Sequence, residues 1–210
     1  MPRVRRELRD AVDALSAADV IMAETIARWG PPRIRRPVPV DQRFAALVRT
    51  ICFQQIAGRA ADAIHGRVVA ALDARVTAAE VLALGADDLR GCGLTGAKTR
   101  SILDLAARVT SGSLRLDQAG RWPDERVIAE LTQVWGIGEW TAQMFMMFEL
   151  GHLDVWPAGD LGVRKGWAIV YSLDAVPDAE EIAPMADPLS PYRSVAAWYC
   201  WRAVEPVPFA

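Results

Sequence analysis

The apolar positions along most of this 210-residue chain recur at the three- and four-residue spacing of amphipathic helices. The clearest apolar stripe begins after Asp41, which suits a helix N-cap, and runs to Cys52. A later helical stripe ends at Gly112, a residue type that commonly terminates helices. No segment alternates apolar and polar residues in the way that a half-exposed strand does. The pattern therefore predicts an all-α protein.

Proline and glycine punctuate this helical pattern near both ends of the chain. Residues 1–29 read as helix, which Gly30 ends, and four prolines in 31–39 predict a non-helical connector. Towards the C-terminus, Ser190-Pro191 suits an N-cap followed by a proline in the first helical position. We therefore expect the last helix to begin directly after Ser190.

Composition is that of an ordinary globular protein, with 52% hydrophobic and 24% charged residues and a net charge of −2. No apolar run approaches the roughly 18 residues that a membrane span requires, and no secretory signal is recognisable. The scattered Cys52, Cys92 and Cys200 lack metal-ligand spacing and read as buried hydrophobes in a reducing, cytoplasmic protein. All basic residues except Lys98 and Lys165 are arginines, so a lysine nucleophile has few candidates.

The densest motif is LTQVWGIGEWTA at residues 131–142, where an apolar helix runs into glycine-hydrophobic-glycine and a second helix follows at once. Gly136 and Gly138, on either side of Ile137, allow a tight turn and a close approach of the backbone to a ligand. The first amides of the second helix, up to Thr141, face outward at the positive end of the helix dipole and suit a phosphate. A DNA-phosphate hairpin fits the full pattern better than an ordinary corner between helices.

Four segments carry a resemblance to a known family: VWGIGEWTAQMF, DVWPAGDLGVRKGW, LVRTICFQQIAGRAADAI and SPYRSVAAWYCWR. Together they resemble the helix-hairpin-helix DNA glycosylase superfamily, specifically the 3-methyladenine DNA glycosylase II family, over residues 40–203. The resemblance implies a catalytic aspartate after the hairpin, and the matching residue is Asp160, twenty-two positions after Gly138. It also implies a DNA wedge in the 47–64 segment, where Gln55 aligns with the intercalating residue.

The chemistry of base removal gives a second argument for Asp160, in addition to the resemblance. Asp160 follows Gly159 and precedes an apolar helix, so it also suits a purely structural N-cap. Removing a base from deoxyribose generates an oxocarbenium-like sugar, which a fixed carboxylate stabilises or to which it guides water. Asp154 is the only close rival, and the resemblance favours Asp160.

Sister families that also nick the strand carry a lysine nucleophile two residues before the hairpin threonine, or directly before it in the alternative alignment. Glu139 and Trp140 occupy those positions here, and neither is an amine. A tryptophan can stack on a flipped base and attracts a cationic one most strongly. Trp140 is therefore a candidate for the base pocket, together with Phe53, Met144 and Trp156, although each of these also suits a protein core. The four C-terminal cysteines that bind an iron–sulfur cluster in the endonuclease III branch are missing.

Two departures from the family pattern affect DNA binding. Glu139 places a negative charge beside the expected phosphate site, which weakens binding unless the side chain points away. Gln55 stands where some relatives have leucine, and an amide can hydrogen-bond to the orphaned partner base. A solvated helix end is the alternative interpretation of Gln54 and Gln55.

These inferences predict a two-lobed helix-hairpin-helix glycosylase fold without the N-terminal β domain of many bacterial members. One lobe spans 41–152, the other combines 1–40 with 153–210, and the active cleft lies between them. The expected function is excision of alkylated purines, of the 3-methyladenine and 7-methylguanine type, from double-stranded DNA by a nucleoid-associated monomer. The resemblance implies no cofactor, and it leaves open whether a monovalent cation binds at the hairpin. The alternatives are a non-catalytic DNA-binding protein and a bifunctional glycosylase/lyase that uses Lys98 or Lys165.

Overall fold

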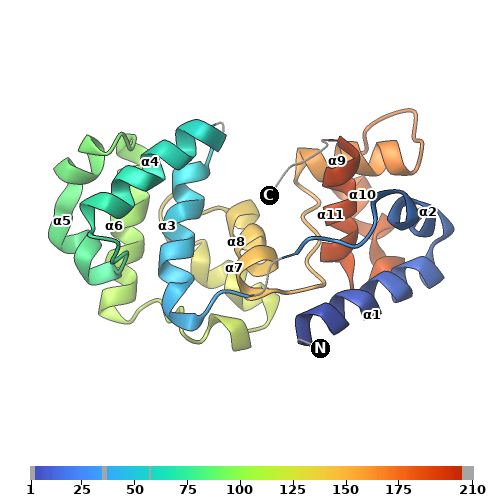
Figure 1. Cartoon of the computed structure of the whole chain (residues 1–210), viewed down its shortest axis with the longest axis horizontal. Helices are drawn as coiled ribbons and strands as arrows, with labels where there is room; N and C mark the ends of the chain where they lie inside the picture. The colour runs from blue at the N-terminus through green and yellow to red at the C-terminus, as the bar shows by residue number, and fades with distance from the viewer. Residues whose placement is uncertain (1–2, 35–36, 57, 205–210) are drawn as a thin grey trace. The chain divides into compact units, whose positions relative to one another are not determined.

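The computed structural model describes residues 3–34, 37–56 and 58–204 of the chain. Every regular element within these ranges is helical, so the predicted all-α class is confirmed (Figure 1). The chain divides into two compact units, which we call the hairpin unit, Pro37–Leu150, and the terminal unit, Met1–Arg36 with Gly151–Ala210. None of the described helices is long and apolar enough to cross a membrane.

The hairpin unit contains six α-helices, two 3-10 turns and a π-helical turn among its described residues. In chain order these are η1 (Val40–Gln42), α3 (Arg43–Phe53), α4 (Gly58–Ala71), α5 (Ala78–Gly91), α6 (Gly96–Ser111), η2 (Ala119–Arg121), α7 (Asp124–Leu131), α8 (Glu139–Phe145) and η3 (Met146–Leu150). The predicted apolar stripe of α3 is buried from Phe44 to Cys52. Helix α3 contacts α4, α6 and α8 and so forms the centre of this unit.

The predicted helix start at Asp41 is wrong. The amide of Gln42 donates to the carbonyl of Pro39 at 2.9 Å, which closes a tighter 3-10 turn around Asp41. Helix α3 therefore begins at Arg43, and no side chain caps it. The predicted helix end at Gly112 is correct, because Gly112 adopts a left-handed conformation (φ +77°) directly after α6.

The terminal unit is built from both ends of the chain. Its helices are α1 (Arg3–Ala18), α2 (Val20–Trp29), α9 (Leu161–Val170), α10 (Ala179–Met185), the 3-10 turn η4 (Asp187–Leu189) and α11 (Arg193–Val204). The predicted helix over 1–29 is broken in two, because Asp19 caps α2 by accepting a 2.7 Å hydrogen bond from the amide of Met22. The hydroxyl of Tyr199 donates to the carbonyl of Gly30 at 2.8 Å and ties α11 to the end of α2.

Helices α9 and α11 pack against each other more extensively than any other helix pair described (Figure 1). Gly166 makes this packing possible, because a Cβ atom at this position would collide with the backbone carbonyl of Cys200. The close approach fixes the axis of α9, and with it the position of the residue that precedes α9, Asp160.

The predicted N-cap at Ser190 is also wrong, because α11 begins only at Arg193. Ser190 ends η4, and its hydroxyl donates to Oδ2 of Asp154 at 2.9 Å. Arg193 donates from Nε and Nη2 to the two oxygens of the same carboxylate, each at 2.9 Å. Asp154 therefore anchors the start of α11.

Candidate functional site

The glycine-rich motif forms a tight hairpin between α7 and α8. Gly136 has a left-handed backbone (φ +80°), and a Cβ atom there would collide with Oγ of Ser101. The amide of Ile137 donates to the carbonyl of Val134 at 3.0 Å, which closes the turn. Gly138 is the N-cap of α8, and the helical course continues through the π turn to Leu150.

The two glycines present backbone rather than side chains to solvent at the turn of the hairpin. Gly136 and Gly138 are exposed, whereas Ile137 and the side chain of Thr141 are buried. The first helical hydrogen bond of α8 runs from Ala142 to Gly138, and the amides of Gly138 and Thr141 meet no acceptor among the described residues. Amides of this kind at a helix start can bind an anion.

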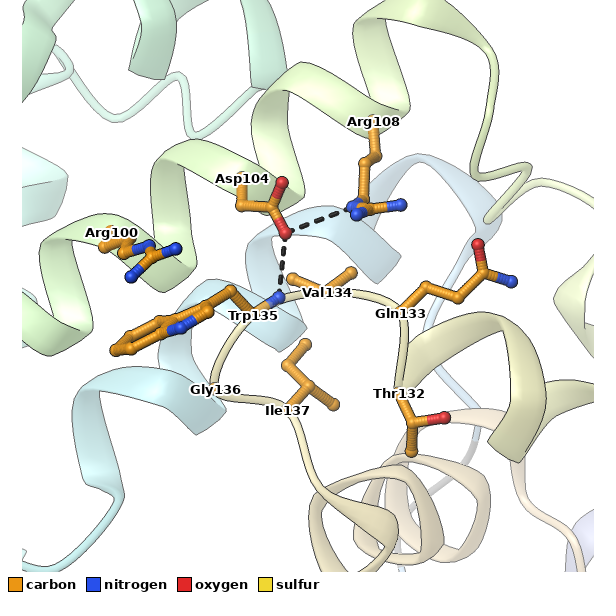
Figure 2. A pocket seen from close by; sticks show the side chains of 9 residues that line it. All are labelled: Arg100, Asp104, Arg108, Thr132, Gln133, Val134, Trp135, Gly136 and Ile137. Carbon is orange, nitrogen blue, oxygen red and sulfur yellow. Dashed lines mark hydrogen bonds and ion pairs between the residues drawn. The ribbon is translucent and has the colours of Figure 1, made fainter.

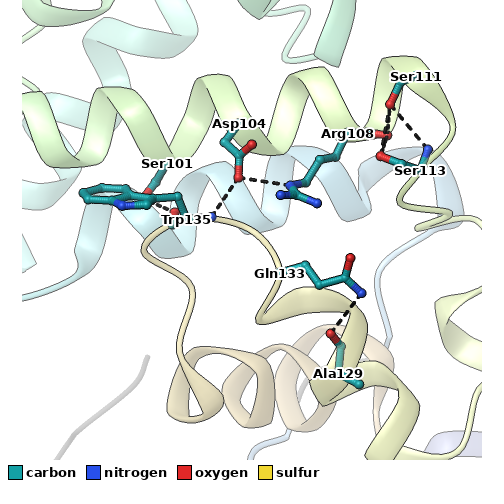
Figure 3. A network of polar contacts seen from close by, with 8 residues as sticks. All are labelled: Ser101, Asp104, Arg108, Ser111, Ser113, Ala129, Gln133 and Trp135. Atoms are coloured by element: carbon teal, nitrogen blue, oxygen red, sulfur yellow. Dashed lines mark hydrogen bonds and ion pairs between the residues drawn. The ribbon is translucent and has the colours of Figure 1, made fainter.

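Side chains of helix α6 anchor the hairpin by hydrogen bonds to its backbone. Oγ of Ser101 donates to the carbonyl of Trp135 at 2.7 Å, and Oδ2 of Asp104 accepts the amide of the same residue at 2.8 Å. Figure 3 shows both contacts, together with the 3.1 Å hydrogen bond from Nε of Arg108 to Asp104. Partial burial acts to raise the pKa of Asp104, but the hydrogen bonds from Trp135 and Arg108 outweigh it and hold that pKa below its usual value.

An open groove of about 490 Å³ lies between α6 and residues 132–137, which connect α7 to α8 (Figure 2). Arg100 and Arg108 line its α6 side, and the guanidinium carbon of Arg100 lies 4.4 Å from the centre of the Trp135 ring. The sequence analysis did not identify Ser101 and Asp104 as the residues that anchor the hairpin, because the polar positions of their helix resemble an ordinary solvent-facing side.

The turn after α3 contains both glutamines that the sequence singled out. Gln55, the wedge candidate, is exposed and has a left-handed backbone (φ +57°), which is uncommon for a residue with a side chain. Gln54 is not a solvated helix end. Its Nε2 donates to the carbonyl of Gly136 and to Oγ1 of Thr141, each at 3.2 Å.

The charged side chains near the hairpin have defined contacts. Oε1 of Glu139 accepts a 3.0 Å hydrogen bond from Gln143, one turn further along α8, so the carboxylate is drawn away from the helix start. Nζ of Lys98 donates to the carbonyl of Cys52 at 2.8 Å and caps the last turn of α3. Burial lowers the pKa of the Lys98 amine. Lys165, the other lysine, is exposed on α9.

Three base-pocket candidates belong to the hairpin unit and differ in accessibility. Trp140 is 43% exposed on the first turn of α8, whereas Met144 is buried. Phe53 is half-buried, with the guanidinium carbon of Arg49 4.1 Å from its ring centre and His65 packed edge-on at 6.4 Å. Burial, and then the charge of Arg49, lower the pKa of His65, which disfavours the protonated, proton-donating form of this imidazole.

Asp160 lies in the terminal unit as the N-cap of α9. Its Oδ1 accepts hydrogen bonds from the amide of Val163 at 2.8 Å and from Nε1 of Trp201 at 2.9 Å. A Cβ atom on Gly162 would lie 2.8 Å from the Trp201 ring and 3.0 Å from Oδ1 of Asp160, so the glycine leaves room for this contact. The carboxylate is thus held by two donors from two helices.

The other two candidates of this unit have structural partners. Asp154 makes the two-pronged ion pair with Arg193 described above, which separates its role from that of Asp160. Trp156 is half-buried, packs edge-on against Trp167 with ring centres 5.4 Å apart, and donates from Nε1 to the carbonyl of Ile182 at 3.3 Å.

Comparison with known proteins identifies relatives of this arrangement. The family model described as "HhH-GPD superfamily base excision DNA repair protein" matches residues 48–190. The DNA-3-methyladenine glycosylase 1 of Schizosaccharomyces pombe is 29% identical over 206 residues, which cover 93% of this chain and 90% of that protein.

Solved structures agree with the sequence comparison. The S. pombe 3-methyladenine DNA glycosylase in complex with abasic DNA matches with a TM-score of 0.82 and 30% identity, covering 92% of this chain and 95% of that one. The DNA-3-methyladenine glycosidase of Bacillus halodurans matches with a TM-score of 0.83 and 31% identity, covering 92% and 88%. The residues matched by the family model, 48–190, include the hairpin and the helix that Asp160 caps.

Proposed function

This chain belongs to the HhH-GPD superfamily of base excision DNA repair proteins, and we propose that it is a monofunctional DNA glycosylase that releases alkylated purines from double-stranded DNA. The observation that carries the proposal is Asp160, whose Oδ1 is held by the amide of Val163 and the indole of Trp201. The names of its relatives, 3-methyladenine DNA glycosylases, support the same substrate class. We place its activity on DNA in the cytoplasm, as a monomer.

The proposed chemistry is assisted departure of an already activated base. As the glycosidic bond breaks, positive charge develops on the sugar, and the Asp160 carboxylate stabilises that cation or guides water to it. Because the carboxylate is fixed by hydrogen bonds before the reaction, little reorganisation is needed at the moment of bond cleavage. This chemistry requires no cofactor.

The proposed substrates follow from the leaving group. Purines methylated at N3 or N7 carry a positive charge that weakens the glycosidic bond, so they need no general acid. The lowered pKa of His65, which lies beside Phe53, disfavours the protonated imidazole that a general acid requires. Trp140 is exposed and can stack on a cationic ring, an interaction of about 0.5–2 kcal/mol.

DNA binding is assigned to the hairpin and the neighbouring turn. We propose that the amides around Gly136, Ile137, Gly138 and Thr141 hold a backbone phosphate, with the two glycines leaving room for it. We propose that Gln55, exposed at the tip of the turn after α3, enters the base stack as the wedge.

The test is to incubate the protein with a duplex methylated at N3 of adenine and N7 of guanine, and to identify released bases by chromatography. A matched duplex containing hypoxanthine measures the preference for cationic bases. We expect free 3-methyladenine and 7-methylguanine, much slower release of hypoxanthine, and an uncut abasic strand. Binding without any release would favour a non-catalytic DNA-binding protein, and hypoxanthine release at an equal rate would require a general acid that the proposed site does not include.

A further inference from the structure

We call the turn after α3 that contains Gln54 and Gln55 the wedge turn, and residues 136–141 the phosphate hairpin. The two lie in different parts of the sequence, yet one side chain joins them. Nε2 of Gln54 donates to the carbonyl of Gly136, 82 residues away, and to Oγ1 of Thr141 on α8. Both acceptors belong to the hairpin motif, one before and one after its second glycine. Gln54 therefore connects to both sides of the hairpin with a single amide group.

Both ends of this link are held by side chains of α6. On one side, Lys98 of α6 caps α3 at the carbonyl of Cys52, two residues before Gln54. On the other side, Ser101 and Asp104, also of α6, hold the carbonyl and the amide of Trp135, one residue before Gly136 (Figure 3). A group held between two braced segments transmits the position of one to the other.

The backbone shows why Gln55 depends on this link. Gln54 leaves the helical conformation (φ −56°, ψ 130°) and Gln55 adopts a left-handed one (φ +57°), so the chain turns sharply here and leaves Gln55 exposed. A left-handed backbone is unfavourable for a residue other than glycine and persists only where its surroundings hold it. The Gln54 amide supplies such a hold directly beside the strained residue.

We propose that Gln54 is a positioning residue that couples the phosphate hairpin to the wedge turn. Binding of a DNA phosphate at the hairpin then positions Gln55 for base flipping. The inference rests on the proposed glycosylase function and deepens it. Gln54 acts through the conformation of Gln55 and not by contact with the base or the sugar. Its removal should therefore impair flipping far more than binding to undamaged DNA.

The test compares four variants: Gln54→Ala, Gln54→Glu, Gln55→Ala and the double variant Gln54→Ala/Gln55→Ala. Gln54→Glu keeps the size of the side chain and removes both N–H donors. Gln42→Ala is the matched control, because Gln42 is an exposed glutamine at the other end of α3, outside the hairpin and the turn that contains Gln55. Thermal unfolding of each variant verifies that it is folded.

Three readouts separate coupling from simple loss of structure. Fluorescence anisotropy gives the affinity for an undamaged duplex, 2-aminopurine fluorescence beside a single 7-methylguanine reports flipping, and single-turnover release of 7-methylguanine reports excision. For Gln54→Ala and Gln54→Glu we expect undamaged-DNA affinity within about twofold of wild type and flipping reduced about tenfold, the effect of losing one or two hydrogen bonds. The control should match wild type in all three readouts.

The double variant decides whether Gln54 acts through Gln55. If it does, the double variant flips no more slowly than Gln55→Ala alone, whereas independent roles give additive losses and overturn the proposal. Wild-type flipping in Gln54→Ala, or an equal loss of undamaged-DNA binding, also overturns it. If the wild-type protein releases no base at all, the proposed function itself fails; if it does release base, these outcomes refute the coupling alone.

Discussion

Nε1 of Trp201 donates a 2.9 Å hydrogen bond to Oδ1 of Asp160, which joins the last helix of the chain to the N-cap of α9. Trp201 is only 6% exposed, so this indole is fixed by packing before any substrate binds. The same oxygen accepts the amide of Val163. The contact gives a buried tryptophan a direct influence on the proposed catalytic group.

Replacing Trp201 by phenylalanine tests that influence. Trp201→Phe keeps an aromatic ring but removes the donor, and losing one hydrogen bond to a charged group should lower single-turnover excision about tenfold. Trp198→Phe is the matched control, because Trp198 is buried in the same helix and packs edge-on against Tyr199. Equal excision rates in the two variants would show that the Trp201 contact does not assist catalysis.

The packing of α9 on α11 predicts a strong effect at Gly166. Gly166→Ala forces a methyl group against the backbone of Cys200, and we expect a loss of about 1–3 kcal/mol in the free energy of unfolding, with a lower Tm. Gly66→Ala, in an exposed position of α4 where a Cβ atom meets nothing within 4 Å, should stabilise the protein by about 0.5–1 kcal/mol. Thermal unfolding measures both, and a Tm for Gly166→Ala at or above wild type would contradict the close helix packing.

The ion pair of Asp154 with Arg193 predicts a pH dependence of stability. Partial burial acts to raise the pKa of Asp154, but the hydrogen bonds from Arg193 and Ser190 outweigh it and leave the pKa lowered. A carboxyl group with a lowered folded-state pKa stabilises the protein above its unfolded-state pKa, near 4, and this contribution is lost as the pH falls through the folded-state value.

Urea unfolding of wild type and Asp154→Asn measures this contribution. At pH 7 the variant should be less stable by roughly 1–2 kcal/mol, because the pair is partly exposed. The difference should shrink steadily below pH 4 as the wild-type carboxyl group becomes protonated. A difference that stays constant between pH 7 and pH 3 would show that the charge of Asp154 contributes nothing.

The contacts of the lysines predict the absence of strand cleavage. Lys98 donates to the carbonyl of Cys52, and the hairpin positions of sister-family lysines hold Glu139 and Trp140. We therefore expect borohydride to trap no covalent protein–DNA adduct, and abasic product to stay uncut until alkali is added. Although burial lowers the pKa of Lys98, a change that favours an amine nucleophile, its role in capping α3 removes it from that chemistry. A trapped band that disappears in Lys98→Gln or Lys165→Gln would establish the bifunctional alternative.

The sequence was most informative where function depends on local backbone geometry. Helical periodicity predicted the all-α fold, and the position of Asp160 before an apolar segment predicted an N-cap, which α9 has. The starts of α3 and α11 were mispredicted, because local signals at Asp41 and Ser190 were overridden by a 3-10 turn and by the contact with Asp154.

Partners that are remote in sequence could not be predicted in the same way. Gln54 meets Gly136 across 82 residues, and its own neighbourhood shows only a polar helix end. Trp201 lies in α11, where every residue from Ser194 to Trp201 is buried, so periodicity identifies no face that points towards Asp160. The aromatic richness of this helix was the only available signal.

The most direct test of the account is the effect of Asp160→Asn on release of 3-methyladenine. The substitution removes the charge with almost no change in size, so the affinity for damaged duplex should be nearly unchanged. Single-turnover release of the free base should fall by about 10²–10³-fold, the usual contribution of such an electrostatic group. A variant that binds damaged DNA and keeps more than about a tenth of the wild-type rate would contradict the assignment of Asp160 as the catalytic carboxylate.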